Sequence, residues 1–150
     1  MPVNHRGVTL LELVVAMAII FLIVTISFPS LKSYSSYQDL KNSTEKMIGD
    51  LKLAQQKSVT EQIKYSLQVT ALSADYSMIK KSQSPVTVEN YILPTPIVVA
   101  STTGIVAQEV IFNSAGAVEN SGEIFLQNLQ TLQQTKIIIK PSGYVSWEKI

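Results

Sequence analysis

The sequence predicts an α+β protein: a long N-terminal, partly transmembrane helix packed on an antiparallel β-sheet or β-sandwich head. Three observations predict this class. Residues 8–31 are almost wholly apolar, residues 32–62 repeat apolar side chains at helical spacing, and residues 63–150 contain only short runs with strand periodicity. A chain of 150 residues has room for one folded domain and an appendage.

The apolar segment at residues 8–31 contains a single ionisable side chain, Glu12. A helix needs roughly 20 apolar residues to cross a bilayer, so this segment has the length of a membrane span. In the middle of a bilayer a lone carboxylate would cost roughly 2.5 to 3.5 kcal/mol. Three interpretations are open: a secretory signal peptide, an ordinary single-pass anchor, or a leader and helix in which Glu12 has a function.

The helix is expected to continue beyond the apolar segment as an amphipathic half, residues 32–62. Leu40, Met47, Leu51 and Ala54 recur at spacings that place them in one stripe of a helix. Between the two halves stands Pro29, which lacks a backbone N–H and clashes with the preceding turn, so we expect a helix kink there. The apolar stripe requires a covering layer.

Short runs with the pattern of strands supply that layer in the head, residues 63–150. KYSLQVT and DYSMIKK form one predicted hairpin, and KIIIKPSGYVSW forms another around its Pro-Ser-Gly turn. The remaining runs, separated by further Pro and Gly residues, are VTVENYIL, PIVVA, EVIF and GEIFLQN. Neither the order of the strands nor the number of sheets follows from these patterns.

The composition argues against an enzyme. The chain has no cysteine and its only histidine is His5, which excludes Cys-His chemistry and cysteine-type metal sites. It contains no acidic calcium loop, no glycine-rich phosphate loop and no G-x-S-x-G motif. We therefore expect no catalytic residue, no metal and no cofactor. The net charge of +1 does not favour an acidic partner.

The start of the chain carries a specific motif. Gly7 is followed by VTLLE and then LVVAMAII, and this resembles the leader of type IV pilins and type II secretion pseudopilins. In that family a short basic leader ends in Gly and a Glu stands at the fifth mature position, which here is Glu12 (12 minus 7). Val8 departs from the Phe or Met usual at the first position. Pro29 is the twenty-second mature residue (29 minus 7), where pilin helices commonly carry a proline.

The resemblance implies that residues 1–7 are a prepilin leader and that prepilin peptidase cleaves between Gly7 and Val8. The new amine of Val8 would then be methylated. Residues 8–31 would hold the subunit in the bacterial cytoplasmic (inner) membrane as a single-pass protein with its head outside the cytoplasm. The implied partners are the peptidase, the inner-membrane assembly platform and other pilins, and Glu12 would pair with the N-terminal amine of a neighbouring subunit.

A long helix followed only by strands is similar to the GspH/FimT type of minor pilin or pseudopilin. The segments IGDLKLAQQKSVTEQ, VIFNSAGAV and GEIFLQN contribute to this resemblance. It implies a subunit of a type IV pilus, a type II secretion system or a competence machine, which primes assembly or lies at the filament tip. The alternative is a binding module on the same anchor, either an adhesin or a DNA receptor.

A basic C-terminal region takes up DNA in some FimT-like minor pilins. The residues that would contact nucleic acid here are Lys136, Lys140 and Lys149, with Tyr144 and Trp147 as stacking groups. After cleavage the chain would contain no arginine, the side chain that makes bidentate contacts to phosphate. That absence argues against nucleic acid as a partner.

Overall fold

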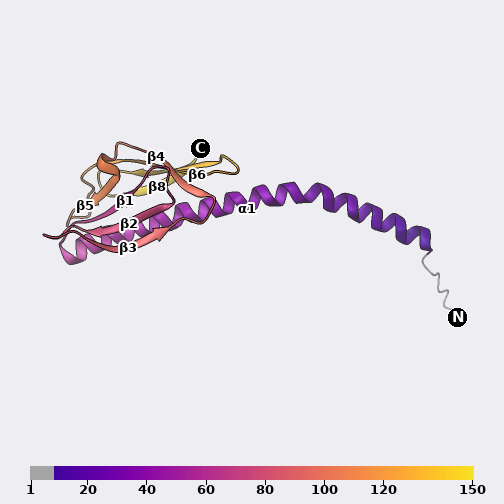
Figure 1. Cartoon of the computed structure of the whole chain (residues 1–150), viewed down its shortest axis with the longest axis horizontal. Coiled ribbons are helices and arrows are strands. Elements are labelled where there is room, and N and C mark those ends of the chain that lie inside the picture. The colour runs from indigo at the N-terminus through magenta and orange to yellow at the C-terminus, as the bar shows by residue number, and fades with distance from the viewer. Residues whose placement is uncertain (1–8) are drawn as a thin grey trace. The chain divides into compact units, whose positions relative to one another are not determined.

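The structure, a computed structural model, describes residues 9–150, and for residues 26–33 it describes the backbone but not the side chains. The chain forms two compact units, Met1–Ser35 and Ser36–Ile150. The helix α1 (Leu10–Glu61) contributes residues to both, and all the strands belong to the second unit (Figure 1).

Side chains define both ends of α1. Thr9 precedes the helix, and its Oγ1 accepts a hydrogen bond from the N–H of Glu12 at 3.2 Å, as an N-cap residue does. After Glu61, Gln62 adopts a left-handed backbone conformation, with φ 56°. Its side-chain Nε2 donates to the carbonyl oxygen of Val59 at 2.6 Å. This bond satisfies one of the carbonyl groups that a helix C-terminus leaves without a partner.

The predicted stripe on the second half of the helix is confirmed. Leu40, Met47, Leu51 and Ala54 are all fully buried. They join side chains of both sheets in one hydrophobic core. The helix therefore packs on the strands through the face that the spacing of these residues predicted.

The strands form two four-stranded antiparallel sheets. Sheet A has the order β3-β2-β1-β5, and sheet B has the order β4-β6-β7-β8. The strands of sheet A are β1 (Tyr65–Val69), β2 (Asp75–Lys80), β3 (Val86–Ile92) and β5 (Glu109–Phe112). Those of sheet B are β4 (Ile97–Thr103), β6 (Gly122–Asn128), β7 (Gln134–Ile139) and β8 (Val145–Lys149). A short 3₁₀ helix, η1 (Val106–Gln108), precedes β5.

Both predicted hairpins are present. β1 pairs with β2 in a register that places Leu67 opposite Met78, and both side chains are fully buried. β7 pairs with β8, and the turn between them is closed by a hydrogen bond from the N–H of Lys140 to the carbonyl oxygen of Tyr144. The pairing of β1 with the distant β5 was not predicted. It makes β1 an inner strand of sheet A.

Candidate functional site

The predicted site residue Glu12 lies in the first turn of α1 with its side chain exposed. Its backbone N–H donates to Thr9 Oγ1, so Thr9 and Glu12 occupy the first and last positions of a T-x-x-E capping sequence. A carboxylate in the first turn is also favoured by the positive end of the helix dipole. Within the single chain, Glu12 therefore has a local stabilising role, which the sequence analysis did not identify.

The side chains around Glu12 form an exposed apolar surface. Leu10 and Leu11 are 81% and 75% exposed, and large apolar side chains remain exposed as far as Val24. An apolar surface of this extent on one chain marks contact with another protein or with a membrane. Across the part of the chain that the structure describes, no helical stretch combines the length and the apolar character that crossing a membrane requires.

The other predicted site residues near the N-terminus lie outside the residues and side chains that the structure describes. Gly7 and Val8 precede the described residues, and the side chain of Pro29 belongs to the stretch for which only the backbone is described. The backbone of α1 continues as helix through residue 29. Cleavage, methylation and the kink therefore stay predictions.

The lysines proposed for nucleic-acid contact do not converge on one surface. Lys136 Nζ lies 2.8 Å from Glu148 and 3.3 Å from Glu123, and these carboxylates, Glu148 first, raise the pKa of Lys136. Lys149 Nζ lies over the ring of Tyr37 on the helix, 4.4 Å from its centroid. Lys140 Nζ lies over the neighbouring Tyr144 ring. Each lysine is thus engaged with a different group of its own chain.

Of the two proposed stacking residues, only Tyr144 is open to solvent, at 59% exposed. Trp147 is partly buried and packs against the hydrophobic core, where it lies opposite Ile137 of β7. Trp147 is therefore mainly a structural residue. Among the described side chains, no three His, Cys, Asp or Glu residues lie close enough to hold a metal ion.

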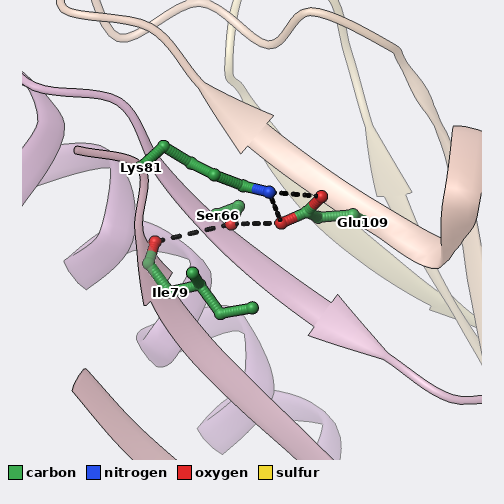
Figure 2. A network of polar contacts seen from close by, with 4 residues as sticks. All are labelled: Ser66, Ile79, Lys81 and Glu109. Carbon is green, nitrogen blue, oxygen red and sulfur yellow. Dashed lines mark hydrogen bonds and ion pairs between the residues drawn. The ribbon is translucent and has the colours of Figure 1, made fainter. Parts of the chain in front are cut away.

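A charged network that the sequence analysis missed stabilises sheet A (Figure 2). Lys81 Nζ lies 2.7 and 2.9 Å from the two carboxylate oxygens of Glu109. Ser66 Oγ donates to Glu109 Oε1 at 2.6 Å and lies 3.4 Å from the carbonyl oxygen of Ile79. Ser66 is fully buried, and the Glu109 side chain is only 13% exposed. The network joins β1, the end of β2 and β5, which are far apart in sequence, so no local pattern could reveal it.

A second polar contact joins α1 to sheet A. The Tyr76 hydroxyl donates to Asp50 Oδ2 at 2.7 Å, and the Tyr76 ring stacks on Tyr91 with the centroids 4.9 Å apart. Burial, together with the hydrogen bond to Asp50, raises the pKa of Tyr76 far above its usual value. The phenol therefore stays protonated and donates to the carboxylate. Both networks are structural supports of the head, not reactive groups.

Comparison with known proteins agrees with this picture in both the N-terminal motif and the fold. The family model "Prokaryotic N-terminal methylation motif" matches residues 3–28. A search of curated proteins finds no match to the sequence.

Solved structures with a similar fold include the minor pseudopilin EpsH from the type 2 secretion system of Vibrio cholerae. One of its structures matches with a TM-score of 0.63 and 10% identity, covering 74% of this chain and 97% of that chain. A second EpsH structure gives 0.61 and 9%, with 73% and 93% covered. The type IV minor pilin FimU of Pseudomonas aeruginosa gives 0.58 and 15%, with 77% and 92% covered.

At these identities the likeness to EpsH and FimU establishes the fold, and the methylation motif is an independent observation from the sequence. Together they confirm the resemblance that the sequence predicted. The chain carries the N-terminal methylation motif of prokaryotes and has the fold of the GspH/FimT type of minor pseudopilins and pilins.

Proposed function

We propose that this chain is a minor pilin or pseudopilin subunit of a type IV pilus, type II secretion or competence machine. The observation that carries the proposal is the methylation motif at residues 3–28 on a chain with the EpsH and FimU fold. The role is that of a structural subunit that primes assembly or lies at the filament tip. Filament subunits of this kind are not enzymes.

Processing is the first step of the proposed mechanism. Prepilin peptidase removes residues 1–7 and methylates the amine of Val8, and residues 8–31 hold the subunit in the inner membrane with its head outside the cytoplasm. The exposed apolar side chains between Leu10 and Val24 support this step, because they need a lipid or protein environment. The inner-membrane platform then moves the subunit into a filament of other pilins.

Assembly is the second step, and Glu12 is its proposed determinant. In a bundle of N-terminal helices the apolar side chains around Glu12 pack against neighbours, which removes water from the carboxylate. A charge in such surroundings persists when it is paired and carries a penalty of several kcal/mol when it is not. The amine of Val8 on a neighbouring subunit is the proposed partner, so Glu12 would set the register of the subunits.

Mass spectrometry of the protein purified from membranes of its host tests the processing step. We expect an intact mass that corresponds to a chain starting at Val8, plus one methyl group on the terminal amine. A Gly7→Ala variant serves as the control and should retain the leader. An intact Met1, or a start near Phe28 as a signal peptidase would leave, would contradict the proposal.

Two substitutions of Glu12 separate pairing from helix capping. Glu12→Leu removes both the charge and the polar side chain at the third position of the capping sequence, whereas Glu12→Gln removes the charge but keeps a side chain suited to that position. We expect both variants to be processed and inserted normally and to be at least about tenfold depleted from sheared filaments, as a loss of roughly 1.4 kcal/mol or more would produce. Incorporation of Glu12→Gln at the wild-type level would show that Glu12 acts through the cap.

A further inference from the structure

Three connections between strands meet at one end of the unit Ser36–Ile150. Residues 70–74, 93–96 and 129–133 are linked by backbone hydrogen bonds, from Leu93 N–H to Ala74 O at 2.9 Å and from Leu129 N–H to Pro96 O at 3.0 Å. The C-terminus joins them through Ile150 N–H and Gln134 O at 3.2 Å. Lys149 lies over Tyr37, so this is the end at which the unit's part of α1 begins (Figure 1).

Large apolar side chains project from this end. We call them the apolar tips, and they are Leu72, Ile92, Leu129, Leu132 and Ile150, which are 83%, 71%, 56%, 69% and 60% exposed. The three connections contain no ionisable side chain. The opposite end differs, because it carries the ion pairs Lys64–Glu119, Lys80–Glu61 and Lys81–Glu109. The three connections are therefore uncharged, with Asp75 and Lys149 beside them, while the opposite end combines ion pairs with exposed apolar side chains such as Val86.

The backbone adds an independent observation at two of the tips. Leu72 and Leu132 have φ angles of 61° and 58°, in the left-handed region that favours glycine and asparagine. At each position a leucine combines an unfavourable backbone conformation with an exposed apolar side chain. Both features only reduce the stability of an isolated soluble head. Contact with an apolar environment would give these two leucine side chains a function.

The length of the chain indicates which environment lies within reach. Four residues, 32–35, separate the end of the proposed membrane segment from the start of the head, which makes five steps along the chain (36 minus 31). Even a fully extended chain spans at most about 3.6 Å per residue, so this connection is no longer than about 18 Å. Whatever its conformation, the end of the head that carries Ser36 stays near the bilayer surface while the subunit is anchored.

We propose that the apolar tips contact the phospholipid surface of the inner membrane before the subunit enters the filament. This inference rests on the proposed membrane anchor. The tips lie on several segments: Leu72 on one loop, Leu129 and Leu132 together on another, Ile92 at the end of β3 and Ile150 after β8. A fluid lipid surface accommodates such dispersed side chains without a complementary shape. Because the loops are uncharged, the contact is to the acyl and glycerol region of zwitterionic lipid and does not depend on anionic head groups.

The absence of cysteine makes a direct test available, since one introduced cysteine carries one fluorophore. The full chain would be placed in phosphatidylcholine nanodiscs, one copy per disc, with nitroxide-labelled lipid as the quencher. Probes at Leu72→Cys and Leu132→Cys report on the tips. Ser142→Cys, exposed in the turn between β7 and β8, is the matched control at the other end of the head, and Val14→Cys reports on the anchor.

We expect the two tip probes to be quenched at least about twofold more strongly than the Ser142 probe, with equal quenching in discs that contain anionic lipid. Tip probes quenched no more than Ser142, with Val14 quenched, would overturn the lipid contact and leave the anchor intact. An unquenched Val14 probe would overturn the anchor and this inference together. If the tip probes were protected from the nitroxide quencher only in discs that hold two copies of the chain, a second chain and not lipid would be the partner of the tips. This result would overturn the lipid contact.

A second variant keeps the test independent of labels at Leu72 and Leu132 themselves. Leu72→Asn with Leu132→Asn suits the left-handed backbone at both positions and removes two tips. We expect its melting temperature in detergent to equal or exceed that of the wild type, while quenching of a probe at Leu129→Cys in nanodiscs falls at least about twofold. Unchanged quenching at Leu129 would overturn the inference.

Discussion

Glu12 combines a local role in the first turn of α1 with a proposed role in subunit pairing. The sequence indicated a misplaced charge, and the structure places that charge three residues after the capping hydroxyl of Thr9. The T-x-x-E pattern that specifies this cap was readable from the sequence. The same residues also begin the apolar segment, so one short stretch of sequence encodes both a helix cap and a candidate membrane helix. Pairing with another chain lies beyond what a single sequence encodes locally.

At Asp50, a residue-scale property depends on tertiary packing. Burial raises the pKa of the carboxyl group, although the hydrogen bond from Tyr76 opposes that rise. A carboxyl group whose pKa is higher in the folded chain than in the unfolded chain holds its proton more tightly when folded. The folded state therefore loses stability as the pH rises from about 4, near the unfolded pKa, through the folded pKa.

Asp50→Asn tests this sign, because the amide oxygen still accepts the Tyr76 hydroxyl but does not ionise. We expect the variant to match the wild type near pH 3 and to become the more stable protein by pH 7. Thermal unfolding followed by circular dichroism at several pH values measures the difference. Titration of the other carboxylates changes the stability of both proteins equally, so it cancels in the difference between them. A difference that is constant between pH 3 and 7 would contradict the assigned pKa shift.

At the scale of elements, local periodicity predicted most of the fold. The stripe through Leu40, Met47 and Leu51 identified the buried face of α1, and alternation in residues 65–69 identified β1. Sequential hairpins could also be expected, because adjacent strands with short turns pair readily. The sequence could not predict that β1 pairs with β5 or that β4 pairs with β6, because these pairings depend on contacts between distant segments.

A hydrogen bond joins two elements, α1 and β7. Thr44 and Thr135 are both fully buried and their hydroxyl oxygens are 2.7 Å apart. Thr44 also donates to the carbonyl oxygen of Leu40 at 2.8 Å, so the bond between the threonines is donated by Thr135. Thr44→Val would leave the Thr135 hydroxyl buried without its acceptor, and we expect it to cost about 1 to 3 kcal/mol of unfolding free energy.

The double variant Thr44→Val with Thr135→Val is the matched control. It replaces both hydroxyls with methyl groups of similar shape, and we expect it to be more stable than Thr44→Val alone. Urea unfolding of both single variants and the double variant gives the coupling energy between the two sites. Strictly additive effects would show that the hydroxyl contact does not dock the helix on sheet B.

At the scale of the whole molecule, one hydrophobic core serves the helix and both sheets. Leu51→Ala removes side-chain volume from a fully buried position, and we expect a loss of about 2 to 5 kcal/mol in a single cooperative transition. Leu53→Ala, two residues away and 37% exposed, should cost much less. Unfolding of the two variants in urea measures both. Separate transitions for helix and strands would contradict a common core.

The same scale shows why the sequence identified the N-terminal motif of the protein better than the properties of the head. The leader motif is contiguous, so a short stretch of sequence contains it entirely. The Lys81–Glu109–Ser66 network and the engagement of Lys136 and Lys149 depend on strand order. When the strand order is unknown, the sequence of the C-terminal region suggests that its lysines form one cationic surface.

The strand order also determines when the head can fold as the chain emerges from its N-terminal side. A chain that emerges with residue 36 first can complete sheet A once Phe112 has appeared. β4 emerges earlier than β5, yet its ladder partner β6 begins only at Gly122. In that interval β4 lacks the backbone groups with which it pairs in the folded head. The side chains of Ile97 and Val99, which are buried in the folded head, also lack the residues that cover them. β4 is therefore the strand that stays longest without a ladder partner as the chain emerges, and the one most prone to misfolding or aggregation in that interval.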